Sequence, residues 1–178
     1  ASSDNSAQIA KSYGDRVRYF RSDQTYSLAK VRNRCVAQAR GDYVGFLDCD
    51  DSWFPQKLEK QVPLFENDPE IGLVFCDTIF FNDKRDICQI YKKYKPPRGR
   101  IFRELFQTYF LAMGSVMVRR PLISDPEWFD ERINILSDMY LFLKIAYQYK
   151  FDYVDEPLAK WRVHSSSTSF KNYGIFAT

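Results

Sequence analysis

The stretch RGDYVGFLDCDDSWFPQKLEKQ at residues 40–61 decides how this chain folds and where its chemistry lies. Residues 43–47, YVGFL, form a near-continuous apolar run, which predicts a strand buried on both faces. The acidic cluster DCDD follows at 48–51, and Pro55 suits the first turn of a helix over 56–68. Ligands of open α/β sheets bind beyond the carboxyl ends of strands, so the acidic cluster stands where a site is expected.

The rest of the chain alternates between strand-like and helix-like segments. Apolar patterning predicts strands at 16–20, 71–81, 115–120 and 151–155, and helices at 28–40, 101–110 and 138–150, with Ser137 as the cap of the last helix. This alternation is typical of an α/β fold with a mostly parallel sheet. The 178 residues show no linker and no internal repeat, so we expect a single domain over 1–178.

The composition excludes several classes of protein. A hydrophobic fraction of 45% with 17% aromatic residues supports a packed core and excludes disorder. The net charge of +3 is too small to indicate nucleic-acid binding. No apolar run reaches the roughly 18 residues of a membrane span. The four cysteines show no zinc-site spacing and no C-x-x-C, which favours a reducing, cytoplasmic location.

One segment departs from the even charge balance. Residues 92–100, KKYKPPRGR, carry five basic side chains and no acidic one. A solvated surface loop is one interpretation of this run. The other is a contact for phosphate or acidic lipid, which would bring the protein to the inner face of the membrane as a peripheral partner.

The acidic cluster itself allows two interpretations. Asp48, Asp50 and Asp51 repel one another unless they are solvated or share a divalent cation, and Mg²⁺ or Mn²⁺ prefers such oxygen ligands together with phosphate oxygens and water. The alternative is an acidic turn that begins a helix, because Asp-Asp-Ser before Pro55 is also good turn chemistry.

Five blocks in order give the sequence a resemblance to a known family. The segment at 40–61 resembles the metal-binding region of family 2 glycosyltransferases, which have the GT-A fold, a Rossmann-like nucleotide-diphospho-sugar transferase fold. Their D-x-D motif corresponds to Asp48-Cys49-Asp50. The other blocks are SLAKVRNRCVAQARG, GSVMVRR, SDMYLFLKIA and PLAKWRVHSSSTS. The similarity extends over nearly the whole chain.

The resemblance implies a reaction. Such enzymes move a sugar from a nucleotide-diphosphate donor, here expected to be a UDP-sugar, to a hydroxyl of a glycan, a lipid-linked or another acceptor, often in cell-surface polysaccharide synthesis. It implies Asp138 as the general base of an inverting displacement, and a helix N-terminus favours the ionised form of that carboxylate. It also implies that Mn²⁺ or Mg²⁺ assists the reaction, with Asp50 as a direct ligand and Asp48 as a second ligand or ribose contact.

Further residues receive roles from the same resemblance. The single histidine, His164, follows Arg162 in a block similar to the family's R-x-H, which implies a metal ligand and a phosphate contact. Arg32 and Asn33 lie in the region that approaches the nucleotide in relatives. Gly114 begins the block expected near the acceptor. Structural roles remain the alternatives: a core histidine, a surface pair and an ordinary strand start.

The beginning of the chain departs from the family pattern. Relatives open with a strand–helix–strand unit, and residues 2–10 match the stretch just after it. We therefore expect the chain to be an N-terminally truncated part of a longer enzyme. Two other functions stay open, namely a nucleotidyltransferase with similar metal chemistry and a catalytically inactive domain that binds sugar or a partner.

Overall fold

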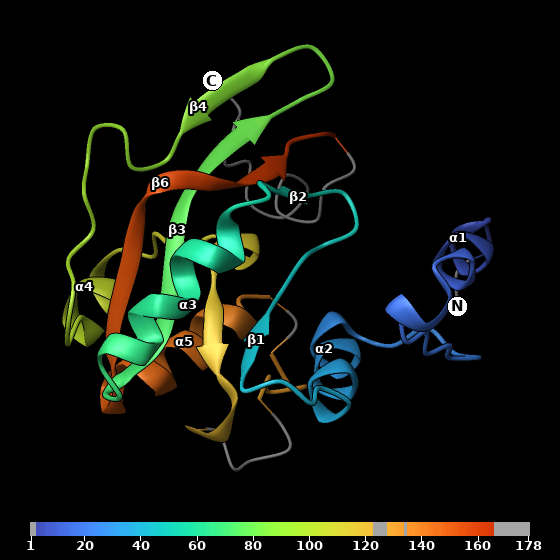
Figure 1. The fold of residues 1–178 in the computed structure, drawn as a ribbon, viewed down its shortest axis with the longest axis horizontal. Coiled ribbons are helices and arrows are strands. Elements are labelled where there is room, and N and C mark those ends of the chain that lie inside the picture. The colour runs from blue at the N-terminus through green and yellow to red at the C-terminus, as the bar shows by residue number, and fades with distance from the viewer. Residues whose placement is uncertain (1–2, 123–127, 134, 166–178) are drawn as a thin grey trace.

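The structure, a computed structural model, describes residues 3–122, 128–133 and 135–165 (Figure 1). Within them a six-stranded sheet has the order β1-β5-β3-β6-β2, and β4 pairs with β3 off this path. The strands are β1 (Tyr43–Gly45), β2 (Ser52–Trp53), β3 (Ile71–Phe81), β4 (Asp86–Gln89), β5 (Met117–Arg119) and β6 (Lys150–Arg162). The polar block SSSTS extends beyond Ser165 and so lies largely outside the described residues.

Two long strands form the centre of the sheet. β3 is buried over its first eight residues, as its apolar sequence IGLVFCDTIFF requires of a strand with helices on both faces. β6 runs parallel to it from Ile71↔Lys150 to Phe81↔Arg162, with register shifts near Cys76 and Asp77. This parallel pairing places the C-terminal ends of β3 and β6 side by side at the same end of the sheet.

The prediction of a mostly parallel sheet is wrong. Only β3 and β6 pair in parallel, whereas β1–β5, β5–β3, β3–β4 and β2–β6 are antiparallel. β1 and β3 do share a direction, since both run antiparallel to β5, but β5 lies between them. Strand–helix alternation predicts that successive strands run in the same direction. It does not reveal that a further strand, here β5, lies between them in the sheet. The described fold is therefore α/β with a mixed sheet.

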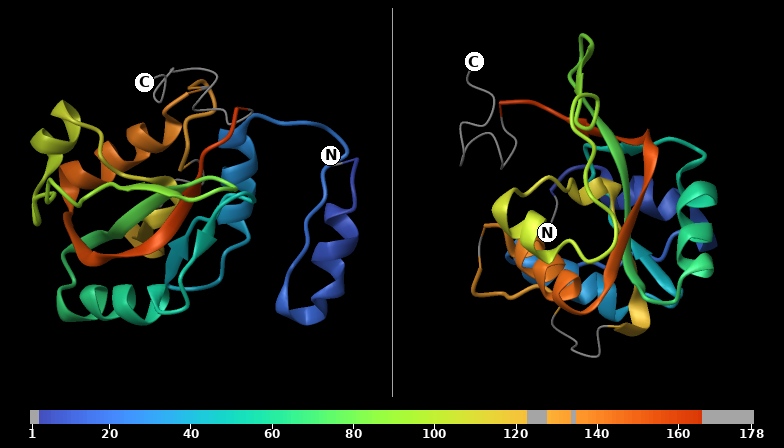
Figure 2. Two further views of the ribbon diagram at one scale, coloured as in Figure 1. Left: turned by 90° about the horizontal axis from the view of Figure 1, so that it is seen from above. Right: turned by 90° about the vertical axis from the view of Figure 1, so that its left-hand side faces the viewer.

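Helices cover both faces of the sheet (Figure 2). α3 (Lys57–Asn67) lies on one face, where Phe65 packs with Val74 and Met117. α4 (Phe102–Gln107) and α5 (Ser137–Gln148) lie on the other face, over the larger core. α2 (Leu28–Ala37) adds Ala29 and Val36 to that larger core.

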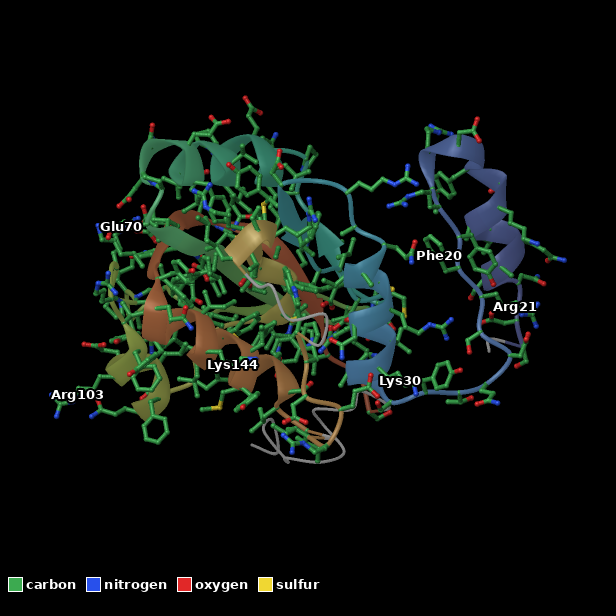
Figure 3. All side chains as sticks on the ribbon, turned by 90° about the horizontal axis from the view of Figure 1, so that it is seen from below. Phe20, Arg21, Lys30, Glu70, Arg103 and Lys144 are labelled. Atoms are coloured by element: carbon green, nitrogen blue, oxygen red, sulfur yellow. The ribbon has the colours of Figure 1, made fainter. Side chains whose placement is uncertain are left out.

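The N-terminal region differs from expectation. Residues 16–20 form no strand; α1 (Ser6–Ser12) and the short helix η1 (Gly14–Arg16) lead into extended chain without a buried residue. Figure 3 shows Phe20 and Arg21 on this arm, on the far side of α2 from the sheet. Of the run 43–47 only Val44 is buried, and Leu47 is 50% exposed. Among the described strands β1 is an edge strand that pairs only with β5.

Two further boundaries need correction. Ser137 is the first residue of α5 and is buried, and no side chain caps that helix. The residue before it, Leu136, has a left-handed backbone with φ 62°. β6 extends to Arg162, well past the predicted end at 155, because its second half pairs with both β3 and β2.

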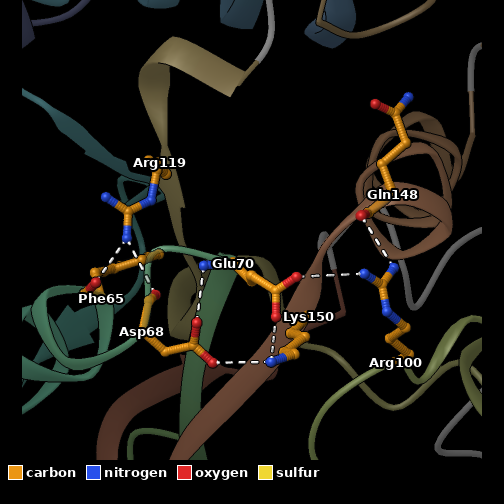
Figure 4. Close-up of polar contacts among 7 residues, drawn as sticks. All are labelled: Phe65, Asp68, Glu70, Arg100, Arg119, Gln148 and Lys150. Atoms are coloured by element: carbon orange, nitrogen blue, oxygen red, sulfur yellow. Dashed lines mark hydrogen bonds and ion pairs between the residues drawn. The ribbon is translucent and has the colours of Figure 1, made fainter.

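The basic segment 92–100 is held by acidic side chains of the same chain. Lys95 pairs with Asp155, and Arg98 pairs with Asp152 while lying over the Tyr153 ring. Arg100 reaches Glu70 at 3.7 Å and donates to the Gln148 carbonyl, at the cluster that also contains Lys150 (Figure 4). These contacts favour the surface-loop interpretation, because three of the five cations already have partners.

A buried lysine links α3 to two strands and a loop. The Lys57 ammonium is 1% exposed, donates to the Gln61 side-chain oxygen at 2.5 Å, and lies 4.2 Å from the centre of the Trp53 ring. The Gln61 amide donates in turn to the carbonyls of Val74 and Ser115. Burial lowers the pKa of Lys57 to about 8, because the charged form loses its hydration.

This burial predicts a pH-dependent stability. A lysine titrates near about 10.4 in the unfolded chain, so between pH 8 and that value the unfolded state binds more protons and the free energy of unfolding rises with pH. Lys57→Met removes this contribution. In urea unfolding, the stability of the variant relative to wild type should therefore fall by about 2 kcal/mol between pH 7.5 and 9.5.

Lys60→Met serves as the matched control, because Lys60 lies on the same helix with its ammonium exposed and paired with Glu156. Its stability relative to wild type should stay level over this pH range. An equally level difference for Lys57→Met contradicts the assignment.

Candidate active site

The acidic cluster forms a tight turn after β1. The Asp51 amide donates to the Asp48 carbonyl at 3.1 Å, which closes the turn. β2 follows directly, and its pairing of Ser52 with Lys160 brings the end of β6 alongside. Asp50 and Asp51 consequently meet residues more than a hundred positions later in the chain.

Asp50 and His164 form the most open pair of the turn. The His164 Nε2 atom lies 3.0 Å from Asp50 Oδ2, and about a third of each side chain is exposed. The Arg162 Nε group donates to the Asp50 carbonyl at 3.1 Å. The predicted metal-ligand residues Asp50 and His164 are thus brought together, although 114 positions separate them.

Asp51 lies deeper than its neighbours. Its Oδ1 atom accepts the backbone N–H of Arg162 at 2.9 Å. Burial, aided by the charges of Asp50 and Asp48, raises the pKa of Asp51 to about 6 against the opposing hydrogen bond from Arg162. A Cβ built on Gly114 would lie 3.5 Å from Asp51 Oδ2, so the predicted acceptor-side block sits against this turn.

The other contact of that block comes from Trp53. Its indole N–H donates to the Gly114 carbonyl at 2.7 Å. Gly114 belongs to η2 (Met113–Ser115), a short helix whose residues are all buried. Gly114 thus supports the acidic turn, while its predicted place near the acceptor stays a prediction.

Asp48 is already paired with a cation. The Arg32 Nη2 group donates to both carboxylate oxygens, at 3.2 and 3.3 Å, and the guanidinium lies 5.6 Å from the centre of the Phe129 ring. This pair joins α2 to the acidic turn. Arg32 therefore lies beside the acidic turn, and its predicted contact with the nucleotide stays a prediction.

Arg162 and Asn33 make contacts that hold the structure together. The Arg162 guanidinium pairs with Asp83 and lies over the Phe81 ring, so its predicted phosphate contact stays a prediction. Asn33 is 6% exposed; its Nδ2 donates to the Phe129 carbonyl and its Oδ1 accepts the Phe129 N–H, each at 2.8 Å. These two hydrogen bonds clamp the 128–133 segment onto α2. They satisfy both the donor and the acceptor of the Asn33 side chain without a nucleotide.

Asp138 lies in the first turn of α5 with a partner that sequence reasoning missed. The Tyr109 hydroxyl donates to Asp138 Oδ2 at 3.1 Å, and the Met139 N–H donates to Oδ1 at 2.9 Å. Burial raises the pKa of Tyr109 well above its ordinary value, and the Asp138 charge adds to this effect. A buried tyrosine hydroxyl usually finds a partner, but nothing in the sequence around 109 names Asp138 as that partner.

The two pairs share an electrostatic influence on Tyr109. Burial and the Asp138 charge raise the pKa of Tyr109, and the Arg32 charge opposes them. A pocket between the N-terminal arm and α2 is a separate feature, because it is lined by Tyr26, Val31 and Cys35 on the opposite side of that helix.

The residues fit a divalent cation as a partial ligand set. Within the described ranges, no three histidine, cysteine or acidic side chains converge as a complete metal cage. Asp50 and His164 do offer one oxygen and one nitrogen in contact and partly open to solvent. That suits a cation that takes its remaining ligands from diphosphate and water. Asp48 fits less well, because Arg32 already neutralises it.

The comparison with known families identifies the chain. The pattern of "Glycosyl transferase family 2" matches residues 1–125, so the chain belongs to glycosyltransferase family 2. An uncharacterized glycosyltransferase of Methanocaldococcus jannaschii is 29% identical over 160 residues, 88% of this chain and 55% of that protein. The hyaluronan synthase of Pasteurella multocida is 29% identical over 98% of this chain and 18% of its own length. The chain thus spans about half or less of these relatives.

Solved structures support the fold. Staphylococcus aureus TarS 1–349 in complex with UDP-GlcNAc superposes with a TM-score of 0.74 at 19% identity, covering 97% of this chain and 50% of that one. Glucosyl-3-phosphoglycerate synthase of Mycobacterium tuberculosis gives a TM-score of 0.54 at 17% identity, covering 92% and 59%. The fold is therefore GT-A-like. No helix in the described part of the chain is long and apolar enough to cross a membrane.

The clamp made by Asn33 predicts a stability effect. Asn33→Ala removes two buried hydrogen bonds and leaves the Phe129 backbone groups without partners, so the free energy of unfolding should fall by about 2–4 kcal/mol. Asn33→Asp keeps the acceptor but sets a buried carboxylate against the Phe129 carbonyl and near Glu131, so it should also be clearly less stable than wild type. Chemical denaturation at neutral pH measures both variants. A cost below about 0.5 kcal/mol for Asn33→Ala, the range of ordinary surface substitutions, contradicts the clamp.

Proposed function

We propose that this chain forms the catalytic part of an inverting, metal-assisted glycosyltransferase that moves a sugar from a UDP-sugar to an acceptor hydroxyl. The observation that carries the proposal is the meeting of Asp50 and His164 at 3.0 Å beside the Asp48–Arg32 pair, and Asp138, held by Tyr109 in the first turn of α5, completes it as the proposed base. Family membership supports the reaction class, and the TarS complex with UDP-GlcNAc supports a uridine nucleotide as the donor.

Asp50 and His164 are the proposed holders of Mn²⁺ or Mg²⁺. When bound, such a cation supplies positive charge that stabilises the diphosphate leaving group. Asp48 has a different role in this proposal. Its pairing with Arg32 fixes the guanidinium at the edge of the site, where it attracts the anionic donor.

Asp138 is the proposed general base. It takes the proton of the acceptor hydroxyl while the hydroxyl oxygen forms a bond to the anomeric carbon. The bond from that carbon to the UDP oxygen breaks, and UDP leaves from the opposite face, so the configuration inverts. The carboxylate accepts hydrogen bonds from the Tyr109 hydroxyl and the Met139 N–H, which hold it in place in the first turn of α5.

The proposal also covers the acceptor, but only as a class of molecule. The similarity to a hyaluronan synthase supports an acceptor of the polysaccharide class, and we extend this to a glycan hydroxyl in cell-surface polysaccharide synthesis. The exposure of Ile135 and Leu136 beside Asp138 leaves room on that side for an acceptor.

The metal assignment makes a first prediction for function. Asp50→Ala and His164→Ala should each weaken Mn²⁺ binding by at least about tenfold, because each removes one of the two protein ligands. The measurement is an Mn²⁺ titration of the intact protein with saturating UDP, followed by the electron paramagnetic resonance signal of free Mn²⁺.

Asp86→Ala is the control for this titration, because Asp86 is an acidic residue on β4 that pairs with Lys160 outside the site. It should bind Mn²⁺ as wild type does. Wild-type affinity in both Asp50→Ala and His164→Ala removes these residues from the ligand set.

The base assignment makes a second prediction. Asp138→Asn keeps the shape of the side chain but cannot accept the proton, so kcat should fall by about 100-fold or more while the KM for UDP-GlcNAc stays within about twofold. The measurement is UDP release from UDP-GlcNAc by the intact protein with a panel of glycan acceptors.

Asp68→Asn provides the control, since Asp68 lies in the ion cluster of Figure 4 with Lys150 and takes no part in the site. Its rate should equal that of wild type. Full activity in Asp138→Asn would falsify the base assignment. The absence of UDP release from wild type with every acceptor leaves the inactive binding domain as the better function.

A further inference from the structure

Tyr109 is placed by packing and not by its own loop alone. It follows α4, whose Leu105 is fully buried, and precedes Phe110, which packs against the core. The Tyr91 hydroxyl donates to the Phe110 carbonyl at 2.9 Å and so fixes the backbone one residue from Tyr109. These contacts therefore fix the position from which the Tyr109 phenol reaches Asp138.

Two hydrogen bonds define the orientation of the Asp138 carboxylate. Tyr109 donates to one oxygen and the Met139 N–H to the other. A carboxylate oxygen has two acceptor positions, so each oxygen keeps one for another donor. With both oxygens anchored, rotation of the carboxylate is restrained while a free acceptor position remains on each.

The electrostatic surroundings keep Tyr109 a donor. Burial and the Asp138 charge raise the pKa of Tyr109 well above its usual range, so the hydroxyl stays protonated at neutral pH. Among the described residues, the Tyr109–Asp138 pair is influenced electrostatically by Arg32 from α2 and the Tyr91 hydroxyl, and it receives a hydrogen bond from the Met139 N–H of α5. Arg32 opposes the Asp138 charge and is itself bonded to Asp48.

We propose that Tyr109 is the positioning residue of the catalytic base: its hydroxyl orients the Asp138 carboxylate toward the acceptor and stabilises the ionised form. The inference rests on the proposed function, in which Asp138 is the base. Tyr109 acts through Asp138 and does not itself touch the substrate. Its hydroxyl thus matters for the chemical step and not for binding of the donor.

The direct test needs no substrate. In the intact protein labelled with ¹³Cγ-aspartate, Asp138→Asn identifies the Asp138 resonance, and a pH titration then follows it in wild type and in Tyr109→Phe. Loss of the hydrogen bond should shift this titration, because one hydrogen-bond donor to the charged form is gone. Tyr43→Phe is the matched control, since it also removes a tyrosine hydroxyl but one whose ring packs against Phe65 on the other face of the sheet.

The outcomes separate cleanly. A shifted titration in Tyr109→Phe with an unshifted one in Tyr43→Phe supports the inference, and the same titration in wild type and Tyr109→Phe overturns it. Should Tyr109→Phe fail to fold, the hydroxyl proton of Tyr109 is followed by NMR in wild type and Asp138→Asn. A resonance that moves when the carboxylate is lost supports the bond, and one that stays in place overturns it.

UDP release from UDP-GlcNAc adds the kinetic readout. Tyr109→Phe should lower kcat by about tenfold with an unchanged KM for the donor, because orientation of the base counts only in the transition state. If Asp138→Asn leaves UDP release intact, the proposed function fails, while the carboxylate titration still decides whether Tyr109 governs Asp138.

Discussion

The parallel ladder between β3 and β6 holds both halves of the candidate site in place. β3 is apolar enough to be buried from Ile71 to Thr78, and β6 follows it in register to Phe81↔Arg162. The C-terminal half of β6 also pairs with β2, through Ser52↔Lys160. The acidic turn is therefore trapped between β1 and β2, with Arg162 and His164 arriving beside it. Loss of this pairing would separate Asp50 from His164, which lie 3.0 Å apart here.

Three carboxylates within four residues are tolerated because each has a different partner. Asp48 is neutralised by Arg32, Asp50 faces His164, and Asp51 accepts a backbone N–H from Arg162. Burial raises the pKa of Asp51 to about 6, which reduces the negative charge of the turn near neutral pH. The arrangement leaves Asp50 as the carboxylate most available to a ligand. Coulomb repulsion at such short range would otherwise disfavour the turn.

Several sequence predictions are wrong for reasons of long-range pairing. A mostly parallel sheet follows from strand–helix alternation only when successive strands are neighbours, and here β5 inserts antiparallel between β1 and β3. The segment 16–20 alternates like a strand, yet no described strand pairs with it. Ser137 is a good capping residue by type, but Leu136 takes the left-handed conformation before α5 and Ser137 is drawn into the core.

By itself the sequence determined the family, the order of the main elements and the acidic turn after β1, because these depend on residue type and local spacing. It also indicated Asp50, Asp138, His164 and Arg32, through motifs whose chemistry is legible in short segments. Only the tertiary structure decided the strand directions, the clamp between Asn33 and Phe129, and the contact of Tyr109 with Asp138. Periodicity reports which side of an element is apolar, whereas the partner of a buried polar group is set by the packing of distant segments.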